Sequence, residues 1–423
     1  MLTPKLLTTL PQSTPRSVLA DLVAGITVAM VALPLSLAIA IASGAPPATG
    51  LVTAIVAGVL ISALGGSRVQ IGGPTGAFIV VVHGVIAEHG FDGLVLSTLM
   101  AGVILVIAGL LRAGSLIRLV PEPVINGFTI GIAAIIALSQ LPDAIGIALP
   151  EGTGAEALER LPAIWDARGT LNPASLATGA ATILAIVALR RAFPRFPGLI
   201  FAVAGASAVV ALFGLPVDTL GARFGALPAT LPRPVIPEMS AARLVELLPS
   251  ALIIAFLAGV ESLLSAMVAD RMVAGRHRPS AEILAQGVAN IGSALMGGLP
   301  ATGAIARTAT NVRAGGRTPL AGIFHALTIL IVMWAAAPLA GYLAMPALAG
   351  LLLVTAWNMS EPQHWHRYAT TGRVSDRVLL ALTLVLTVFT DLTVAIGVGV
   401  ALGLALRLRR REVPPADWTP PDR

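Results

Sequence analysis

The chain has 423 residues, of which 56% are hydrophobic and only 11% charged, whereas a soluble protein carries about 25% charged residues. Its apolar residues lie in long runs, and a run of about 20 apolar residues crosses a bilayer as a helix. These features exclude a soluble enzyme and a disordered protein, and the absence of cysteine excludes disulfides and thiolate chemistry. The net charge of +6 comes from arginines scattered singly between apolar runs, so we expect no nucleic-acid partner.

The predicted elements begin with a polar, proline-containing segment at 1–17, which we assign to the cytoplasm. The apolar run 18–43 that follows is too long for the core of a signal peptide and is predicted as the first membrane helix. A polar segment at 215–248 is predicted as an extracellular linker. Six further apolar segments lie between the first membrane helix and this linker, at 47–65, 74–89, 93–112, 115–141, 174–191 and 196–214.

The second half of the chain repeats this pattern and ends in a short cytoplasmic tail at 411–423. The prediction is an all-α integral membrane protein with 14 transmembrane segments, in a seven-helix repeat at 18–214 and a second one at 249–410. Because seven is odd, the second repeat has to be inverted. Arginine and lysine gather in loops on the side of both termini, so both termini are predicted to be cytoplasmic, in the cell's inner (plasma) membrane. The seven segments of the second half are 249–273, 281–298, 302–314, 318–337, 339–357, 375–390 and 391–410.

Two of the segments, 74–89 and 302–314, are too short to cross the bilayer, and each follows a Gly/Pro-rich stretch. Thr75-Gly76-Ala77 and Thr302-Gly303-Ala304 are the same tripeptide, 227 positions apart. Such interrupted segments in corresponding positions of two halves indicate a transporter binding site. Half-helices that start at mid-membrane present unsatisfied N–H groups and a partial positive charge. The gap between their N-termini is therefore predicted to bind an anion, with both tripeptides lining it.

Two charged residues fall inside predicted membrane segments near this gap. Glu261 lies near the middle of the span 249–273, where a carboxylate is costly and is by default a functional residue. It is predicted to carry a coupling proton or to ligate sodium; the alternative is a structural role as the partner of Arg307 or of a backbone N–H. Arg307 itself lies in the second half-helix, shortly after Thr302. It either attracts the anion, or it snorkels to the cytoplasmic side or pairs with an acid.

Several motifs resemble the SulP anion permeases, a family of sulfate and bicarbonate transporters that includes prestin. The resemblance implies an inverted repeat shared with uracil permeases, a core of helices 1–4 and 8–11, a gate of helices 5–7 and 12–14, a homodimer and an elevator-like motion. It covers the membrane region only: most members carry a cytoplasmic STAS domain, whereas about a dozen residues follow Arg411 here. The motifs are Asp21 to Ala29 with Val31 to Pro34, Ile71 to Phe78, Pro121 to Thr129, Glu261 to Ala266, Gly298 to Thr308 and Gly315 to Gly322.

The resemblance also extends the predicted site. It places the anion between helices 3 and 10, with helices 1 and 8 lining the same space. That adds Ser36, Ile305 and Ala306 to the substrate-binding residues, and Ser265 to Glu261 in ion coupling. Animal members often carry serine at the position of Ala306, so its side chain is not expected to contact the anion.

The sequence thus predicts a secondary transporter of a small anion, such as sulfate, bicarbonate or a dicarboxylate like fumarate, that sits in a lipid bilayer and needs no cofactor. We expect a proton rather than sodium as the coupling ion, and alternating access of the elevator type. The first alternative is a nucleobase:proton symporter, whose site would need an acid in the second half-helix, where this chain has Arg307. An uncoupled anion channel or exchanger is the second. No catalytic motif indicates an enzyme.

Overall fold

The computed structural model describes residues 2–410 apart from 115–120, 151–156, 194–196, 274, 363–364, 366–367, 369, 371–372 and 391. Helices dominate this part of the chain, as predicted, and its strand pairing consists of one two-stranded sheet and one isolated bridge. The tail predicted at 411–423 lies outside the described residues.

Capping residues and prolines determine where helices of the first half begin. α2 starts at Pro15 after a capping box between Thr14 and Ser17, and α7 starts after Asn172, whose side chain accepts from two backbone N–H groups. The elements are α1 Lys5–Thr9, η1 Leu10–Gln12, α2 Pro15–Ala42, α3 Pro47–Leu64, β1 Gly72–Gly73, η2 Gly76–Phe78, α4 Ile79–Leu110, α5 Glu122–Ile145, α6 Ala157–Asp166, η4 Ala167–Thr170, α7 Pro173–Ala192 and α8 Gly198–Phe213.

The second half follows a short helix in the linker, α9, and proline again stands at the start of two of its helices, α11 and α14. Its elements are α9 Leu220–Phe224, α10 Ala241–Met272, α11 Pro279–Leu295, β2 Thr302–Gly303, α12 Ile305–Arg313, α13 Leu320–Ala340, α14 Met345–Met359, α16 Val374–Phe389 and α17 Leu392–Arg410.

The structure differs from the prediction in several elements. By length and composition alone, 7 of the described helices could cross a membrane and three shorter apolar helices accompany them, so the count of 14 spans stays a prediction. The spans predicted at 74–89 and 93–112 run together as η2 and α4, broken at Gly90 with φ 70° and ψ 179°. α10 begins inside the predicted linker because Ser240 caps its N-terminus, a signal that hydropathy does not report. The amphipathic helix α6 lies between the predicted segments 115–141 and 174–191, where the sequence predicted no membrane span.

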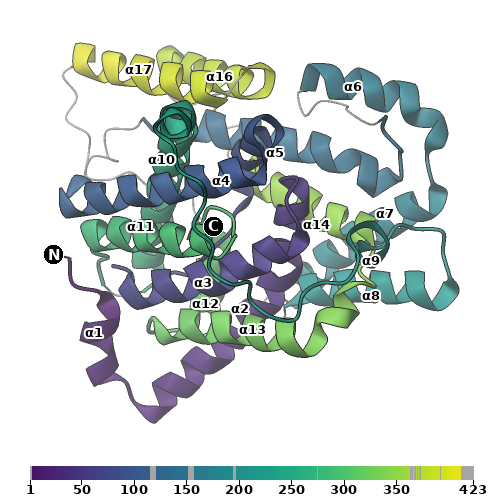
Figure 1. The fold of residues 1–423 in the computed structure, drawn as a ribbon, viewed down its shortest axis with the longest axis horizontal. Helices are drawn as coiled ribbons and strands as arrows, with labels where there is room; N and C mark the ends of the chain where they lie inside the picture. The colour runs from purple at the N-terminus through teal and green to yellow at the C-terminus, as the bar shows by residue number, and fades with distance from the viewer. Residues whose placement is uncertain are drawn as a thin grey trace.

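Helix packing separates two groups of helices. α2, α3, α4, α10, α11, α12 and α13 pack mainly on one another, whereas α5, α7, α14 and α16 form a second group. In Figure 1, α16 and α17 lie side by side along one edge of the molecule. Glycines allow the closest approaches: a Cβ at Gly102 of α4 would lie 2.8 Å from the carbonyl oxygen of Gly287 of α11. Such contacts between small residues are the usual way in which membrane helices pack.

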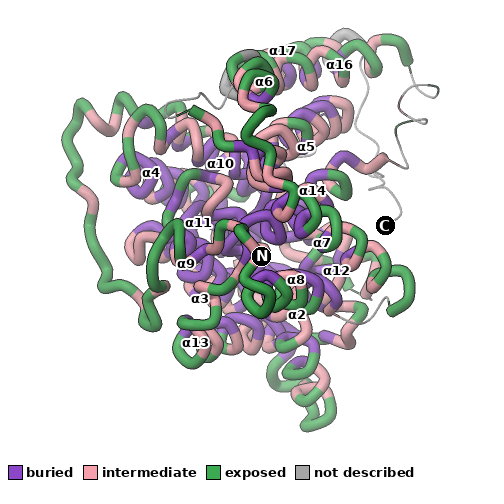
Figure 2. Tube along the Cα trace, turned by 90° about the vertical axis from the view of Figure 1, so that its right-hand side faces the viewer, coloured by how far each residue is buried: buried purple, intermediate pink, exposed green. Residues whose placement is uncertain are grey.

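The surface of the bundle is strongly apolar. Figure 2 shows buried residues along inner helices such as α11 and exposed ones along outer helices. Large apolar side chains are exposed on α8 and α13, among them Leu212, Phe213 and Trp334. A soluble protein would pay a solubility penalty for so many of them, whereas hydrocarbon tails accommodate them.

Candidate functional site

A short antiparallel strand pair joins the two halves of the chain at the centre of the first helix group. β1 pairs with β2 so that Gly72 lies opposite Gly303 and Gly73 opposite Thr302. The N–H of Ala304 extends the pairing by donating to the carbonyl of Ile71 at 2.8 Å. Glycine is needed here, because a Cβ on Gly73, whose φ is 150°, would lie 2.5 Å from Nη1 of Arg307. The pairing brings the two predicted motifs together.

Two helices start directly after this strand pair. η2 begins at Gly76 and leads into α4, and α12 begins at Ile305. Their N-cap residues are Thr75 and Ala304, and neither makes a side-chain cap hydrogen bond. The first N–H groups of both helices are therefore left without a side-chain cap at one place, as the half-helix prediction requires.

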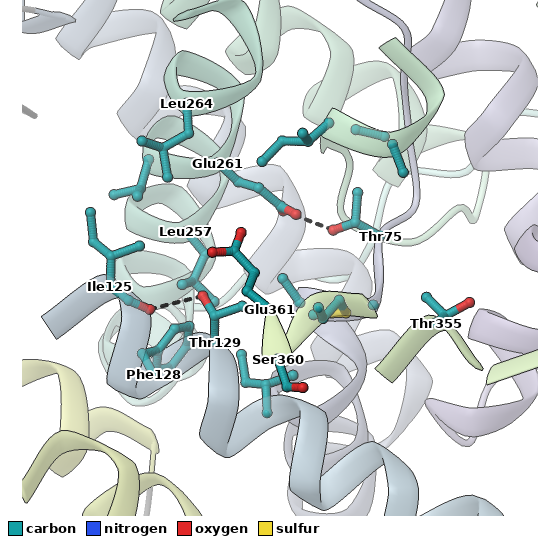
Figure 3. A pocket seen from close by; sticks show the side chains of 18 of the residues that line it. Thr75, Ile125, Phe128, Thr129, Leu257, Glu261, Leu264, Thr355, Ser360 and Glu361 are labelled. Atoms are coloured by element: carbon teal, nitrogen blue, oxygen red, sulfur yellow. Dashed lines mark hydrogen bonds between the residues drawn. The ribbon is translucent and has the colours of Figure 1, made fainter. Parts of the chain in front are cut away.

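A cavity of about 180 Å³ opens at these helix starts. One wall comes from the first helix group and carries Gly76, Ala77 and the residues Ala304 to Ala306, all predicted site residues. The opposite wall comes from α5 and α14, and Figure 3 shows Thr129, Thr355 and Glu361 there. The cavity is smaller than the roughly 300–1,000 Å³ typical of sites for drug-sized ligands. Its size suits a small solute.

Glu261 of α10 and Thr75 meet at the edge of this cavity. The Thr75 hydroxyl donates to Oε2 of Glu261 over 2.8 Å, a contact drawn in Figure 3. Both residues line the cavity. The bond links the start of the first half-helix to α10. A change in the charge of Glu261 would therefore change the strength of this hydrogen bond and the electrostatic potential at the helix N-terminus.

Arg307 is buried beside them, with 2% of its surface exposed. Its Nη2 donates to the carbonyl of Pro74 at 2.7 Å, while Nε and Nη1 have no hydrogen-bond partner among the described residues. Arg307 lines the cavity and is close enough to Glu261 for their charges to interact. Snorkelling to the cytoplasmic side, one of the alternatives for Arg307, is wrong: the burial of the side chain and its bond to Pro74 hold it at the site. A buried guanidinium with two unpartnered nitrogens is a strong attractor for an anion.

Four of the predicted site residues lie behind the cavity, in the packing between helices, and do not line it. Ser36 is fully buried, with its carbonyl oxygen against Gly50 of α3. Thr302 donates its hydroxyl to the carbonyl of Ala258 at 2.8 Å. Gly303 packs against the Gln70 side chain, and Oγ of Ser265 lies 3.1 Å from Oγ1 of Thr308.

Several residues that line the cavity or are buried near it were not predicted from the sequence. Asn126, Thr129 and Glu361 line the wall of the cavity that faces Glu261. Glu282 of α11 is fully buried and accepts from the backbone N–H groups of Gly66 and Ser67. The signal that could have found both acids is the one that found Glu261: an isolated carboxylate in or beside an apolar span.

A second cavity, of about 1030 Å³, lies between α4, α5 and α10 and is lined by His83, Glu88, His89, Arg160 and Glu246. His89 Nδ1 lies 3.1 Å from Oε1 of Glu246. Within the part of the chain that the structure describes, no three His, Cys, Asp or Glu residues are grouped so that they could hold a metal ion.

Comparison with known proteins places the chain in a family. The model of the sulfate permease family matches residues 18–383. The chain belongs to this family. Its members are transporters and not enzymes. A putative sulfate transporter of Bacillus subtilis (strain 168), YvdB, is 41% identical over 376 residues, which are 88% of this chain and 70% of the relative.

The bicarbonate transporter BicA of Picosynechococcus sp. is 31% identical over 393 residues, 90% of this chain and 68% of the relative. The solved transmembrane domain of a cyanobacterial BicA superposes with a TM-score of 0.80 at 28% identity, over 96% of this chain and 99% of that one. The murine Slc26a9 anion transporter in its inward-facing state gives a TM-score of 0.88 over 97% of this chain and 72% of that one. At 18% identity, this second structural similarity is evidence for the fold alone. The chain is a multi-pass membrane protein of the anion-transporter type.

Proposed function

We propose that this protein is a secondary transporter that moves a small anion across the membrane together with protons. The observation that carries the proposal is the buried Arg307, whose Nε and Nη1 lack partners among the described residues beside two uncapped helix N-termini. Arg307 and the starts of both helices line one cavity of about 180 Å³. Sulfate, bicarbonate and a small dicarboxylate such as fumarate fit such a site, and relatives are named for the first two.

Glu261 is the proposed coupling residue. Its carboxylate lies near Arg307 and accepts from Thr75, so in its ionised form it competes with an anion for the same positive groups. Protonation of Glu261 would release these groups to the substrate, and substrate departure would favour loss of the proton. Binding of the anion and of the proton are then coupled by thermodynamic linkage, since each raises the affinity for the other. Sodium at Glu261 is the alternative coupling ion.

Movement between the two helix groups completes the proposal. We assign the first group to the core, helices 1–4 and 8–11 of a seven-plus-seven inverted repeat, and the second group to the gate. The site lies at the boundary between them, with Arg307 on the core side and α5 and α14 on the gate side. An elevator-type displacement of the core would carry the anion across. We further propose a homodimer in the inner membrane with both termini in the cytoplasm.

Arg307 also weighs against the two alternatives. A nucleobase carrier would need an acid on α12, and α12 has none. An uncoupled channel needs no titratable group at its anion site, whereas this cavity has Glu261 beside Arg307.

Purified protein in liposomes that contain a pH-sensitive dye would test the proposal. Sulfate, bicarbonate, fumarate, chloride and uracil would be added in turn, with and without sodium. We expect acidification of the lumen that depends on one anion and not on sodium; labelled uptake replaces the dye for bicarbonate, because CO₂ disturbs the signal. A response to uracil alone, or anion uptake without proton movement, would overturn the proposal.

A further inference from the structure

The second cavity lies at the other end of the helix boundary that holds the candidate site. On α5, the residues that line the first cavity run from Ile125 to Ile132, and those that line the second run from Ile135 to Asp143. α10 contributes to both cavities in the same way, with residues from Leu257 onward in the first and residues up to Ile253 in the second. The two cavities share no described lining residue, and Ile254, between the two stretches of α10, belongs to a buried apolar cluster. Packed apolar side chains therefore separate the cavities.

The second cavity lies on the side of the membrane that the sequence analysis assigns to the outside. Its lining includes Arg223 and Glu246 from the linker that is predicted to be extracellular. Arg160 comes from α6, in the loop after the fifth predicted segment, which lies on the same side in the predicted topology. In an elevator mechanism, an anion that arrives from outside would pass through this cavity before it meets the transport site.

Most charged groups in this cavity already have a partner. Nη1 of Arg223 lies 2.9 Å from Oδ1 of Asp143, and Nδ1 of His89 lies 3.1 Å from Oε1 of Glu246. Glu88 joins the second pair, with Oε2 3.6 Å from Nε2 of His89, and its side chain is 77% exposed, so solvent and salt screen its charge. Among the described lining residues three carboxylates face two arginines, so the arrangement of the charges and not their sum decides where an anion can bind.

Arg160 is the arginine of this cavity that makes no ion pair with a described residue. Its Nη2 donates to the carbonyl of Ser139 over 3.4 Å, a long hydrogen bond, and its Nε is buried without a partner among the described residues. A buried nitrogen of this kind calls for an acceptor from outside the fold. His83 of α4 lines the same cavity and is close enough to Arg160 for their charges to interact, so its ring N–H adds a second donor there.

We propose that Arg160 forms an outer anion site in the second cavity, where small oxyanions such as sulfate bind before they reach the transport site. A guanidinium offers several N–H donors in a fixed plane, which suits an oxyanion. α6 packs on the gate helix α5, and the site only has to collect anions from outside, so Arg160 need not move with the core. The cavity is wide, at about 1030 Å³, so binding there should be weaker than at Arg307. The inference rests on the proposed function, since this site supplies the transport site with its substrate.

A thiol placed in the outer cavity reports its potential without any transport. The chain has no cysteine, so Ser250→Cys, in the cavity wall, gives a single thiol. Intact cells that express this variant would be treated with two membrane-impermeant reagents of similar size, the anionic sulfonatoethyl methanethiosulfonate and the cationic trimethylammonioethyl methanethiosulfonate. Arg160→Gln should slow the anionic reagent and speed the cationic one by roughly threefold each, so that their rate ratio falls about tenfold. External sulfate at constant ionic strength should slow the anionic reagent in a saturable way only when Arg160 is present.

Three controls isolate the charge of Arg160. Arg160→Lys keeps the charge and should keep most of the ratio, whereas Arg168→Gln removes an arginine that lies over the Trp165 ring and does not line the cavity, and should leave the ratio nearly unchanged. Thr230→Cys, in the exposed linker, should give the same ratio with and without Arg160. An equal ratio at Ser250→Cys before and after Arg160→Gln would overturn the outer site, and so would a thiol there that neither reagent reaches from outside.

Uptake then tests the role of the site in anion entry. With labelled sulfate or fumarate outside the cells, Arg160→Gln should raise the half-saturating concentration about threefold at low ionic strength, and added salt should shrink the difference. The maximal rate should change little, because Arg160 lies outside the transport site. An unaltered half-saturating concentration would overturn the role in entry. A wild type that takes up no anion would overturn the proposed function, whereas the reagent ratio would still decide whether Arg160 binds an anion.

Discussion

Two buried polar clusters lie in the first helix group, and they differ in how completely their charged groups are hydrogen bonded. Glu282 is fully buried, and both of its carboxylate oxygens accept hydrogen bonds, from Gly66, Ser67, Ser262 and Gln286. Arg307 is almost as deeply buried, yet two of its three nitrogens have no partner among the described residues.

The difference separates a structural charge from a binding charge. Buried polar groups in native proteins are nearly always hydrogen bonded, and an unpartnered one calls for an explanation. Glu282 has its partners within the fold and no contact with the cavity, so it ties the end of α3 to α10 and α11. Arg307 lines the cavity and has two nitrogens without a partner among the described residues, so we propose that the transported anion is their partner.

The largest effect should come from breaking the satisfied cluster. Glu282→Ala leaves two backbone N–H groups and the side chains of Ser262 and Gln286 without their acceptor. Each buried group left unsatisfied costs about 1–3 kcal/mol, so we expect a loss of several kcal/mol and little folded protein. Thermal melting of detergent-solubilised protein, followed by size exclusion, measures the loss. A melting temperature close to that of the wild type would contradict a structural role.

Arg307→Ala should act on binding instead. The loss of a charged hydrogen bond to the substrate is worth about 1.5–3 kcal/mol, so the half-saturating concentration of the anion should rise roughly tenfold to hundredfold. Thermal stability should change far less than in Glu282→Ala, because most of the polar atoms of Arg307 have no partner to lose. Kinetics of labelled uptake would show the shift. An unaltered apparent affinity would leave the helix N-termini as the only anion-binding groups.

Glu261→Gln separates coupling from binding within the cavity. The amide keeps the size of the side chain and can still accept from Thr75, but it cannot take up a proton. We expect accumulation driven by a proton gradient to disappear while exchange of anion for anion continues. Counterflow of labelled sulfate, with and without a pH gradient, distinguishes the two activities. Undiminished gradient-driven accumulation would rule out a coupling role for Glu261.

The smallest effect is expected from substitution of the two threonines of the repeated tripeptide, which we compare with each other. Thr75 and Thr302 each donate one hydroxyl hydrogen bond of 2.8 Å, the first to Glu261 at the cavity and the second to the backbone of Ala258. Replacement of either by valine should cost about 0.5–1.5 kcal/mol of stability. Only Thr75→Val should alter transport kinetics, by a few-fold, which paired uptake and melting curves would reveal. Equal effects on transport would contradict the division between the two positions.

The sequence predicted which segments lie together better than it predicted the positions of individual side chains. Repeated Gly/Pro motifs indicated two helices that start inside the membrane, and the strand pair with uncapped helices at Gly76 and Ile305 agrees with that prediction. The equal tripeptides suggested equal roles for Thr75 and Thr302. Thr302 instead lies within the strand pair, opposite Gly73, and donates to the backbone of Ala258, whereas Thr75 lies beyond the pair and reaches Glu261 at the cavity. One-dimensional spacing cannot reveal this difference.

The remaining differences have similar causes. The wall from α5 and α14 is brought to Glu261 by packing between segments that are far apart in the sequence, so nothing local in the sequence placed Thr129 and Glu361 opposite Glu261. α10 starts earlier than its apolar run because a capping serine, and not hydropathy, sets its first residue. Ser36 followed from resemblance to a family, and in this chain it lies in the α2–α3 contact.

The central claim is that Arg307 binds the transported anion. A measurement of binding, without transport, tests this claim most directly. A ligand that binds only the folded protein raises its melting temperature as its concentration increases. Sulfate, bicarbonate, fumarate, chloride and uracil would be titrated at constant ionic strength against the wild type and Arg307→Ala. We predict that at least one of the multi-atom anions stabilises the wild type in a saturable way and that Arg307→Ala loses this response. Equal stabilisation of both proteins by that anion, or none by any anion, would contradict the account.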